Sequence, residues 1–490
     1  MSISKSFALT ALTLVATGVA TGVATGVAPA AAQTRAISQS DKASGAKAHP
    51  QLLEQFGGSY AGPQSDYVRR VGQRIAVQSG LSNAQGDFTV TLLNSSVNNA
   101  FAVPGGYVYV TRQLLALMND EAELAAVMGH EVGHVAAQHA RSRSQRSTIA
   151  SVLAGVVGAV AGNSAIGSLL GRGVGLGAQL YTLSFSRSQE TQADDLGVTY
   201  LTRGGYDPLA LSSMLASLAA QNSLDARIAG RSQSAPATWA STHPDPAARV
   251  TRAVQTAKKA AAPGGLRNRD VFLNAINGMV YDDDPQQGVI DGQNFRHAGL
   301  RLAFAAPTGY ALTNGASAVT ITGNGGQAQF SGGAMSGGIE GYVDTVFRAL
   351  AGQSSIQQSQ VQRGRVNGIE TGFATARANT QSGAVDVTVI AYAFDARTAY
   401  HFVTIVPAGR GAGPFEPMFE SMRRLTTAEA ATIRARRVAV VTVKPGDTVA
   451  SLSSRMAYPS LRAERFMILN ALNSTAQLRP GQRVKLITYG

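Results

Sequence analysis

The pentapeptide His130-Glu131-Val132-Gly133-His134 holds the residues whose types and spacing point most directly to chemistry. On a helix, side chains four residues apart lie about 40° apart around the axis, so both imidazoles can reach one metal ion from one face. Glu131 lies about 100° round from His130, where its carboxylate can accept a proton from an attacking water molecule. The pentapeptide therefore predicts a metal-dependent hydrolytic site; a solvated charged helix face is the alternative.

The chain offers a third ligand downstream of the pentapeptide. A catalytic zinc ion needs three protein ligands and one open position. Glu190 and Asp194 share one face of a helix predicted to begin near Ser186. Glu190 can therefore ligate zinc while Asp194, one turn later, orients a ligand imidazole; an ordinary acidic helix face is the alternative. His139, about 180° round from His130 on the helical wheel, is expected to point away and to pack or hydrogen-bond elsewhere.

The hydrophobic pattern predicts the helices and strands that position these residues. Residues 114–141 read as one or two helices with an apolar stripe, so a helix carries the pentapeptide. Residues 88–92 and 108–110 are predicted strands. The turn Pro104-Gly105-Gly106 precedes the second strand, which we expect to be an edge strand that binds an extended substrate as an added strand.

Three motifs in this order resemble the gluzincin peptidase family that includes the CAAX prenyl endopeptidases, HtpX and BepA. They are Asn-Ala-Phe-Ala-Val-Pro-Gly-Gly at residues 99–106, the helix at residues 121–134, and Ser-Arg-x-x-Glu-x-x-Ala-Asp at residues 186–194. The resemblance covers about residues 51–255. Membrane-embedded relatives add spanning helices that this sequence lacks, so the chain is most similar to the soluble, periplasmic BepA-like branch.

The resemblance also implies a role for each residue of the site. One Zn2+ ion per chain is held by His130, His134 and Glu190. Glu131 is the general base, and Asp194 supports a ligand histidine from behind. The implied activity is that of a zinc metalloendopeptidase.

A later segment of the sequence, which contains two candidate site residues, also resembles this family. His243 lies in the loop sequence Ser-Thr-His-Pro, and Arg249 follows it. The resemblance implies that His243 can occupy the fourth position on zinc and keep the enzyme latent; an ordinary loop histidine is the alternative. Arg249 is expected either to stabilise the developing oxyanion in catalysis or to pair with a carboxylate.

Composition limits the classes of protein that the chain can be. Its 490 residues are 44% hydrophobic and 14% charged, which predicts several folded domains and excludes wholesale disorder. The sequence has no cysteine, so disulfides, thiol nucleophiles, Cys-ligated zinc and the lipid of a lipoprotein are excluded. The formal charge of +13 suggests acidic surroundings such as anionic lipid or cell-wall polymer. We expect no nucleic acid partner.

The first 32 residues are expected to be a cleaved signal peptide. An apolar stretch at residues 7–27 follows Lys5, and small residues precede Gln33; an uncleaved anchor helix is the alternative. The predicted location is the periplasm, in soluble form or peripheral to membrane or wall. The uncharged segment Ser147 to Gly171 is predicted as a helical hairpin or lid near the site, or as a peripheral membrane contact.

The chain is predicted to be an α+β multidomain protein. After a flexible leader at residues 33–50, we expect a mainly helical zincin metalloprotease domain at residues 51–255, a linker at residues 256–291, an α+β domain of unknown role at residues 292–427, and a small βααβ unit at residues 438–490.

The βααβ unit resembles a LysM module through residues 443–448 and 478–486. The resemblance implies binding to the glycan of peptidoglycan; a spacer without sugar affinity is the alternative. We expect the unit to fold alone, with Arg479, Arg483 and Lys485 attracting acidic polymer.

Together these features predict an exported zinc metalloendopeptidase that hydrolyses misfolded or unassembled cell-envelope proteins. One alternative is a latent chaperone or peptidoglycan-binding protein whose peptidase site stays closed. Another is a peptidoglycan peptide hydrolase, which the LysM-like unit suggests.

Overall fold

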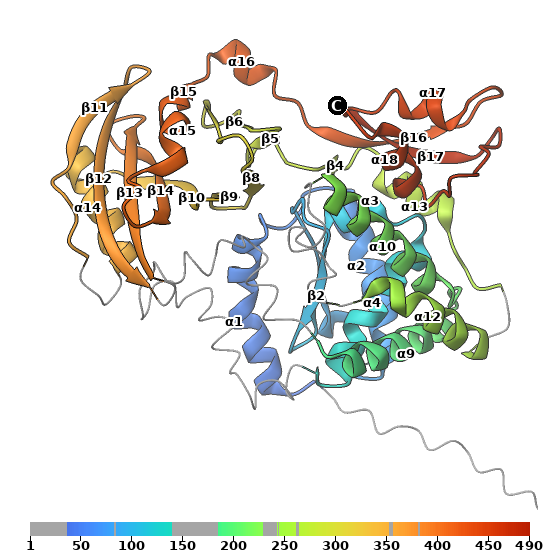
Figure 1. Cartoon of the computed structure of the whole chain (residues 1–490). Helices are drawn as coiled ribbons and strands as arrows, with labels where there is room; N and C mark the ends of the chain where they lie inside the picture. Colours follow the sequence, from blue (N-terminus) through green and yellow to red (C-terminus); the bar gives the residue numbers. More distant parts are fainter. Residues whose placement is uncertain are drawn as a thin grey trace, which may run out of the picture. The chain divides into compact units, whose positions relative to one another are not determined.

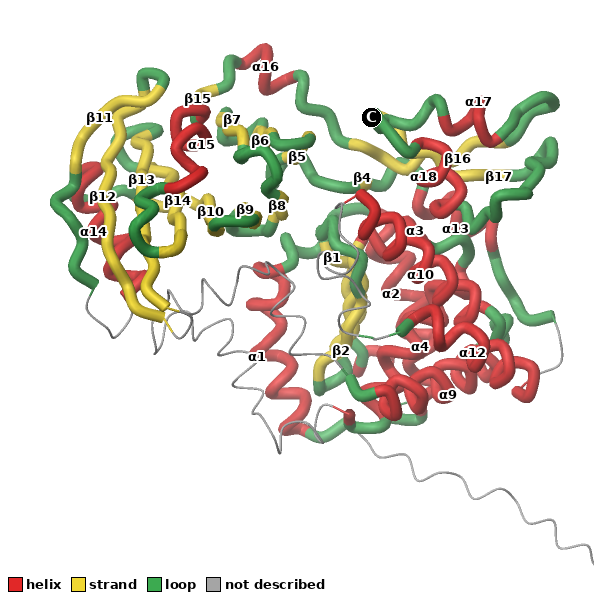
Figure 2. The backbone as a smooth tube through the Cα atoms, in the orientation of Figure 1, coloured by secondary structure: helices red, strands yellow, loops and turns green. Residues whose placement is uncertain are grey.

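The structure is a computed structural model of the chain (Figure 1, Figure 2). It describes residues 37–82, 85–139, 185–228, 243, 245–260, 264–351, 356–380 and 383–490. The predicted signal peptide at residues 1–32 and the uncharged segment at residues 147–171 lie outside the described residues. Of the helices that are described, none is both long enough and apolar enough to cross a membrane. The fold is α+β and multidomain, as predicted.

A three-stranded sheet lies next to the helix that carries the pentapeptide. Its strands are β1 (Thr89–Leu93), β2 (Ala100–Val103) and β3 (Tyr107–Thr111), in the order β1-β3-β2. β3 pairs in parallel with β1 and antiparallel with β2. The prediction of an edge strand after Pro104-Gly105-Gly106 is therefore wrong, because that strand, β3, has a neighbour on each side. Of the described strands of this sheet, β1 and β2 lie at the edges, and β2 directly precedes the turn.

The predicted flexible leader at residues 33–50 is wrong from residue 39 onward, where helix α1 (Gln39–Gln55) begins. Gly45 of α1 lies so close to the turn between β2 and β3 that a Cβ atom would collide with it. His49 Nδ1 lies 2.8 Å from the Tyr109 hydroxyl of β3. The contact face of α1 consists largely of small residues, which is why the hydrophobic pattern did not reveal it.

Helices surround α4 (Glu121–Ala136), which carries the pentapeptide. The Asp120 carboxylate caps it by accepting the Glu123 N–H at 2.9 Å. Every residue from Glu121 to His134 is buried. The prediction of one or two helices over residues 114–141 is confirmed for residues 114–117 and 121–136, which lie in α3 and α4. The other helices of this region are α2 (Pro63–Ala76), α3 (Arg112–Leu117), α9 (Arg187–Arg203), α10 (Ala210–Ile228), α12 (Pro246–Ala260) and α13 (Arg269–Ile276).

The contact between α4 and α9 is very close because both helices carry glycine there. A Cβ atom on Gly133 would lie 3.1 Å from the Ala193 carbonyl oxygen. One on Gly197 would lie 3.2 Å from the His130 backbone nitrogen. Larger side chains would push the helices apart, since protein interiors have little spare volume. The close approach brings the acidic residues at the start of α9 alongside the histidines of α4.

Two further sheets form the α+β region predicted at residues 292–427. One has the order β15-β7-β6-β5, and the other is antiparallel with the order β11-β12-β13-β14-β10-β9-β8. Helix α14 packs on β12 and β13 with a core of its own. The bounds are β5 (Val289–Asp291), β6 (Asn294–His297), β7 (Leu302–Ala305), β8 (Ala311–Asn314), β9 (Val319–Gly323), β10 (Gly326–Ala334), α14 (Gly338–Ala351), β11 (Gln362–Val366), β12 (Ile369–Thr380), β13 (Gly383–Ala393), β14 (Thr398–Pro407), α15 (Glu416–Ser421), β15 (Arg423–Arg424) and α16 (Thr427–Ala431).

The C-terminal segment forms a βααβ unit. It consists of β16 (Arg436–Thr442), α17 (Val449–Ser453), α18 (Arg462–Leu469) and β17 (Arg483–Tyr489), and β4 (Val280–Tyr281) extends its sheet beside β16. Buried side chains of this unit and of the first domain belong to one continuous core. The shared core argues against our expectation that residues 438–490 fold as an independent unit.

Lys485 of β17 anchors the βααβ unit to the first domain. Its side chain is fully buried. Its ammonium group donates to the carbonyl oxygens of Ala116 and Leu117 at 2.8 and 3.2 Å, and to that of Met118. These carbonyls lie at the C-terminal end of α3, where a helix leaves its last acceptors unpaired. The expectation that Lys485 attracts acidic polymer is therefore wrong, because this residue does not reach the surface.

Replacing Lys485 by methionine keeps the length of the side chain but removes the donor from three buried carbonyls. Leaving such groups unpaired costs about 1–3 kcal/mol. We expect Lys485→Met to lower the urea midpoint and the Tm of the full-length protein. The exposed Lys444 of the same unit provides the control Lys444→Met. Equal midpoints for the two variants would contradict the anchoring role.

Candidate metal centre

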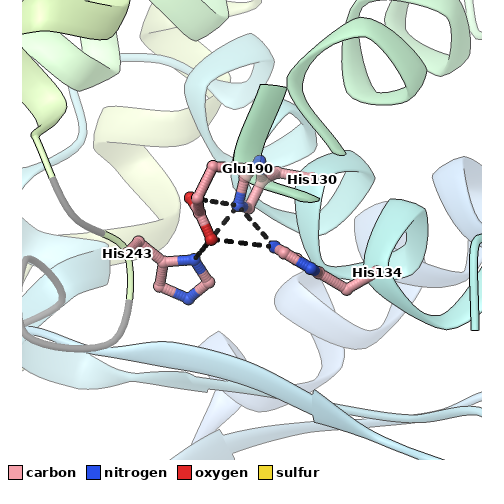
Figure 3. Close-up of side chains that lie close together, drawn as sticks. All are labelled: His130, His134, Glu190 and His243. Carbon is pink, nitrogen blue, oxygen red and sulfur yellow. Dashed lines mark hydrogen bonds and ion pairs between the residues drawn. The ribbon is translucent and has the colours of Figure 1, made fainter. Parts of the chain in front are cut away.

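Two histidines of α4 turn their rings to the same point (Figure 3). His130 and His134 are buried, and their Nε2 atoms lie 3.1 Å apart. The structure thus brings together the two imidazoles that the four-residue spacing predicts on one helix face.

Helix α9 supplies a carboxylate to this point. The Ser186 hydroxyl accepts the Gln189 N–H at 3.3 Å, and Gln189 Oε1 accepts the Ser186 N–H at 3.0 Å. This capping box fixes the first turn of the helix, which contains Glu190. Glu190 Oε1 lies 3.4 Å from His134 Nε2, and Oε2 lies 3.5 Å from His130 Nε2.

His243 completes the cluster from the chain just before α12. Its Nδ1 atom lies 3.0 Å from Glu190 Oε1 and 3.2 Å from His130 Nε2. Its Nε2 atom lies 3.4 Å from Glu131 Oε1. Ligand-type atoms of His130, His134, Glu190 and His243 all lie within 4.8 Å of one another. In the part of the chain that the structure describes, this is the one His, Asp and Glu group suited to a metal ion.

Asp194 and Arg249 lie directly behind the ligands. Asp194 Oδ1 is 3.0 Å from His130 Nδ1. Arg249 donates to both oxygens of Asp194, from Nε at 2.8 Å and from Nη2 at 2.5 Å, and its Nη1 lies 2.6 Å from Glu190 Oε2. This two-pronged geometry suits a guanidinium and a carboxylate. Of the two roles left open for Arg249, these contacts are those of pairing with carboxylates.

The electrostatics of the site favour anionic carboxylates and a neutral imidazole. Burial alone would raise the pKa of Glu190, but the charge of His243 and its hydrogen bond hold it well below the usual range. Burial alone would also raise the pKa of Asp194, but the hydrogen bonds from Arg249 outweigh this effect, so the pKa of Asp194 is lowered. Burial lowers the pKa of His134, which keeps this ring neutral. These are the protonation states that bind a metal ion.

The residues present fit a zinc ion. Because Asp194 accepts from Nδ1 of His130, the Nε2 lone pair of that ring points into the cluster. The pKa of His243 is raised, because the negative charges of Glu190 and Glu131 outweigh the effect of burial, which alone would lower it. The centre therefore favours positive charge. Neither carboxylate oxygen of Glu131 has a hydrogen-bond donor among the described residues. Imidazole nitrogen and carboxylate oxygen are ligands that zinc takes in catalytic sites.

The structure places His139 against the site, and the prediction that it points away is wrong. Helix α4 ends at Ala136, and Gln138 has a φ of 55°, so the helical wheel does not extend to His139. The His139 ring turns back, with Nδ1 2.9 Å from His134 Nδ1. Phe185, which the sequence did not single out, stacks on His134 with ring centroids 3.7 Å apart. The hydrophobic periodicity of the sequence could not predict either contact, because His139 and Phe185 both lie outside the helices α4 and α9.

Known proteins resemble two parts of the chain. Residues 63–257 match the model of peptidase family M48, and residues 441–486 match that of the LysM domain. The beta-barrel assembly-enhancing protease of Yersinia pestis is 30% identical over 194 residues, which cover 39% of this chain and 38% of that protein. The protein of that name from Escherichia coli is 28% identical over 214 residues, covering 43% and 42%.

A mitochondrial protein is similar over the same region. The mitochondrial metalloendopeptidase OMA1 of Schizosaccharomyces pombe is 29% identical over 217 residues, which cover 43% of this chain and 59% of that protein. The matched part of this chain thus amounts to between 38% and 59% of the length of these three relatives. The resemblances to the BepA-like peptidases and to LysM that the sequence suggested are confirmed.

Proposed function

We propose that this chain, of which residues 63–257 match peptidase family M48, is a zinc-dependent metalloendopeptidase that hydrolyses peptide bonds of proteins. The observation that carries the proposal is the convergence of His130, His134 and Glu190 on one buried point, with Glu131 close by. Two histidines and one carboxylate are a donor set of catalytic zinc in peptidases, and they leave one position open for the reaction. One Zn2+ ion per chain fits this donor set.

Each residue of the site has a different role in the proposed hydrolysis. His130, His134 and Glu190 would hold a zinc ion, which would polarise the scissile carbonyl and lower the pKa of the attacking water. Glu131 takes the proton from this water and returns it to the leaving amine. Asp194 orients His130 through Nδ1, and Arg249 pairs with the carboxylates of Glu190 and Asp194.

The proposed substrates are proteins of the cell envelope. The predicted signal peptide at residues 1–32 and the lack of cysteine suit a periplasmic protein that is not a lipoprotein. The names of the assembly-enhancing relatives support a role in envelope protein quality control. No described strand pairs with the outer side of β2, which contacts α4, so its backbone groups there could bind an extended chain. Such binding favours misfolded or unassembled substrates.

The LysM domain supports peptidoglycan as a second partner. Its loops at residues 444–448 and 473–481 are mostly exposed, although the unit is anchored to the first domain. Wall binding would keep the enzyme near envelope substrates. The same domain favours peptidoglycan peptide hydrolysis as the competing function. Purified sacculi and casein, offered in parallel, separate the two, because the proposed endopeptidase cleaves casein and releases no wall peptides.

Glu131→Gln tests the general base. Glutamine keeps the shape of the side chain and leaves all proposed ligands in place, but it cannot take a proton. We expect casein cleavage to fall by about 10²-fold or more, with zinc content unchanged. Asp195→Asn, which removes a partly exposed carboxylate from α9, is the control. Near wild-type cleavage by Glu131→Gln would exclude the assigned role.

His243 supports a latent resting state. Its ring lies against Glu190 and His130 on one side and Glu131 on the other, where a fourth ligand would exclude the attacking water. We propose that the His243 ring must leave this position before a substrate is cleaved.

His243→Ala tests latency by the sign of its effect. We expect basal proteolysis, including self-cleavage, to rise while zinc stays bound by the other three ligands. Metal analysis and casein assays on the same samples measure both. A fall in activity with zinc intact would contradict latency and assign His243 to catalysis. Unchanged activity would leave it as an ordinary loop histidine.

A further inference from the structure

His139 lies behind the metal site and takes no part in the proposed hydrolysis. Its ring is 4% exposed. One nitrogen, Nδ1, lies 2.9 Å from His134 Nδ1, and the other, Nε2, lies 3.0 Å from Gln192 Oε1. Gln189 Nε2 also donates to the His139 carbonyl oxygen at 3.4 Å. Helix α9 therefore holds His139 against the far side of a proposed zinc ligand.

These contacts determine where the protons must lie when a metal is bound. His134 Nε2 faces His130 and Glu190, so Nε2 is the ligand atom. A neutral imidazole carries one N–H and one lone pair, so a lone pair at Nε2 requires the proton at Nδ1. His134 then donates from Nδ1 to Nδ1 of His139. His139 in turn donates from Nε2 to the Gln192 carbonyl oxygen, and every donor meets an acceptor.

The opposite arrangement would not suit a metal ion. If the Gln192 amide donated to His139 Nε2, the proton of His139 would lie on Nδ1 and point at His134. His134 would then accept at Nδ1 and carry its own proton on Nε2. That proton would occupy the position where the metal must bind. The side chains behind the ligand thus select between a ring that binds metal and one that does not.

The two ligand histidines have different supports. His130 donates to the anionic Asp194, which Arg249 holds from behind. The corresponding partner of His134 is a histidine. Phe185 stacks on the His134 ring at an interplanar angle of 21°. The stack fixes the plane of the ring, and the contact with His139 fixes its rotation within that plane.

We propose that His139, supported by Gln192, is a positioning residue that holds His134 in the tautomer and orientation that bind zinc. The inference rests on the proposed function, since it requires His134 to be a zinc ligand. Partners of this kind typically change metal affinity by about 10–100-fold when removed. The role is separate from catalysis, so zinc binding is the property to measure.

Two replacements of His139 separate hydrogen bonding from packing. His139→Phe keeps an aromatic ring but has no acceptor, whereas His139→Asn keeps an acceptor near the position of Nδ1 and loses the ring. Zinc affinity of the full-length protein is measured by competition with a chromophoric chelator, with melting of the metal-free protein as the folding control. We expect His139→Phe to bind zinc about 10–100-fold more weakly and His139→Asn to lose less. Wild-type affinity in His139→Phe, or a greater loss in His139→Asn, would overturn the proposal.

Gln192 gives a second test that does not depend on the fold tolerating a change at His139, because its side chain is exposed. Gln192→Glu keeps an acceptor and removes the donor, whereas Gln192→Met removes both. We expect the Glu variant to retain zinc affinity and the Met variant to lose it. Ser188→Glu adds the same charge one turn earlier on α9 and measures the effect of charge alone. A Glu variant weaker than the Met variant would overturn the proposed direction of donation.

The cobalt(II)-substituted protein provides a spectroscopic check, because its visible absorption reports ligand geometry. We expect the bands to change in His139→Phe and to be restored in His139→Asn. A spectrum that is identical in wild type and His139→Phe would overturn the positioning role. Failure of the proposed function is distinguishable, since wild-type protein would then bind neither zinc nor cobalt at this centre.

Discussion

The close packing of α4 on α9 is the constraint on which the rest of the structure depends. Glycines at positions 133 and 197 let the two backbones approach more closely than side chains would easily allow. The first turn of α9 therefore lies beside the C-terminal half of α4, and a carboxylate from one helix meets two imidazoles from the other. Neither helix could form the centre alone, so the proposed metal site depends on the packing of α4 against α9.

Burying so many ionisable groups requires their charges to balance. Glu190 and Asp194 are nearly inaccessible, and a buried charge without a partner is strongly destabilising. Arg249 contacts both carboxylates and supplies one positive charge. One guanidinium cannot neutralise two buried carboxylates, and the nearby carboxylates also raise the pKa of His243 against the effect of burial. A bound divalent cation would supply the missing positive charge and would link the stability of the centre to its proposed chemistry.

Spacing within one helix predicted that His130 and His134 share a face, because helical geometry is local. The prediction of Glu190 as a ligand also required the family resemblance, since an ordinary acidic helix face has the same spacing of residues. His139 was misplaced because the helix ends before it, and no periodicity describes a chain that leaves a helix. The edge position of β2 depends on how three neighbouring strands pair, and the burial of Lys485 depends on partners far away in sequence. The carbonyls that Lys485 contacts are more than 360 residues away, where local patterns carry no information.

X-ray absorption spectroscopy of zinc in the purified full-length protein tests the central claim most directly, because it counts the ligands of the metal. The account predicts a four-coordinate site with three imidazole nitrogens and one carboxylate oxygen in the resting protein. It also predicts the loss of one imidazole when His243 is replaced by alanine. An oxygen-rich six-coordinate shell, or a shell in which fewer than two imidazoles bind zinc, would contradict it.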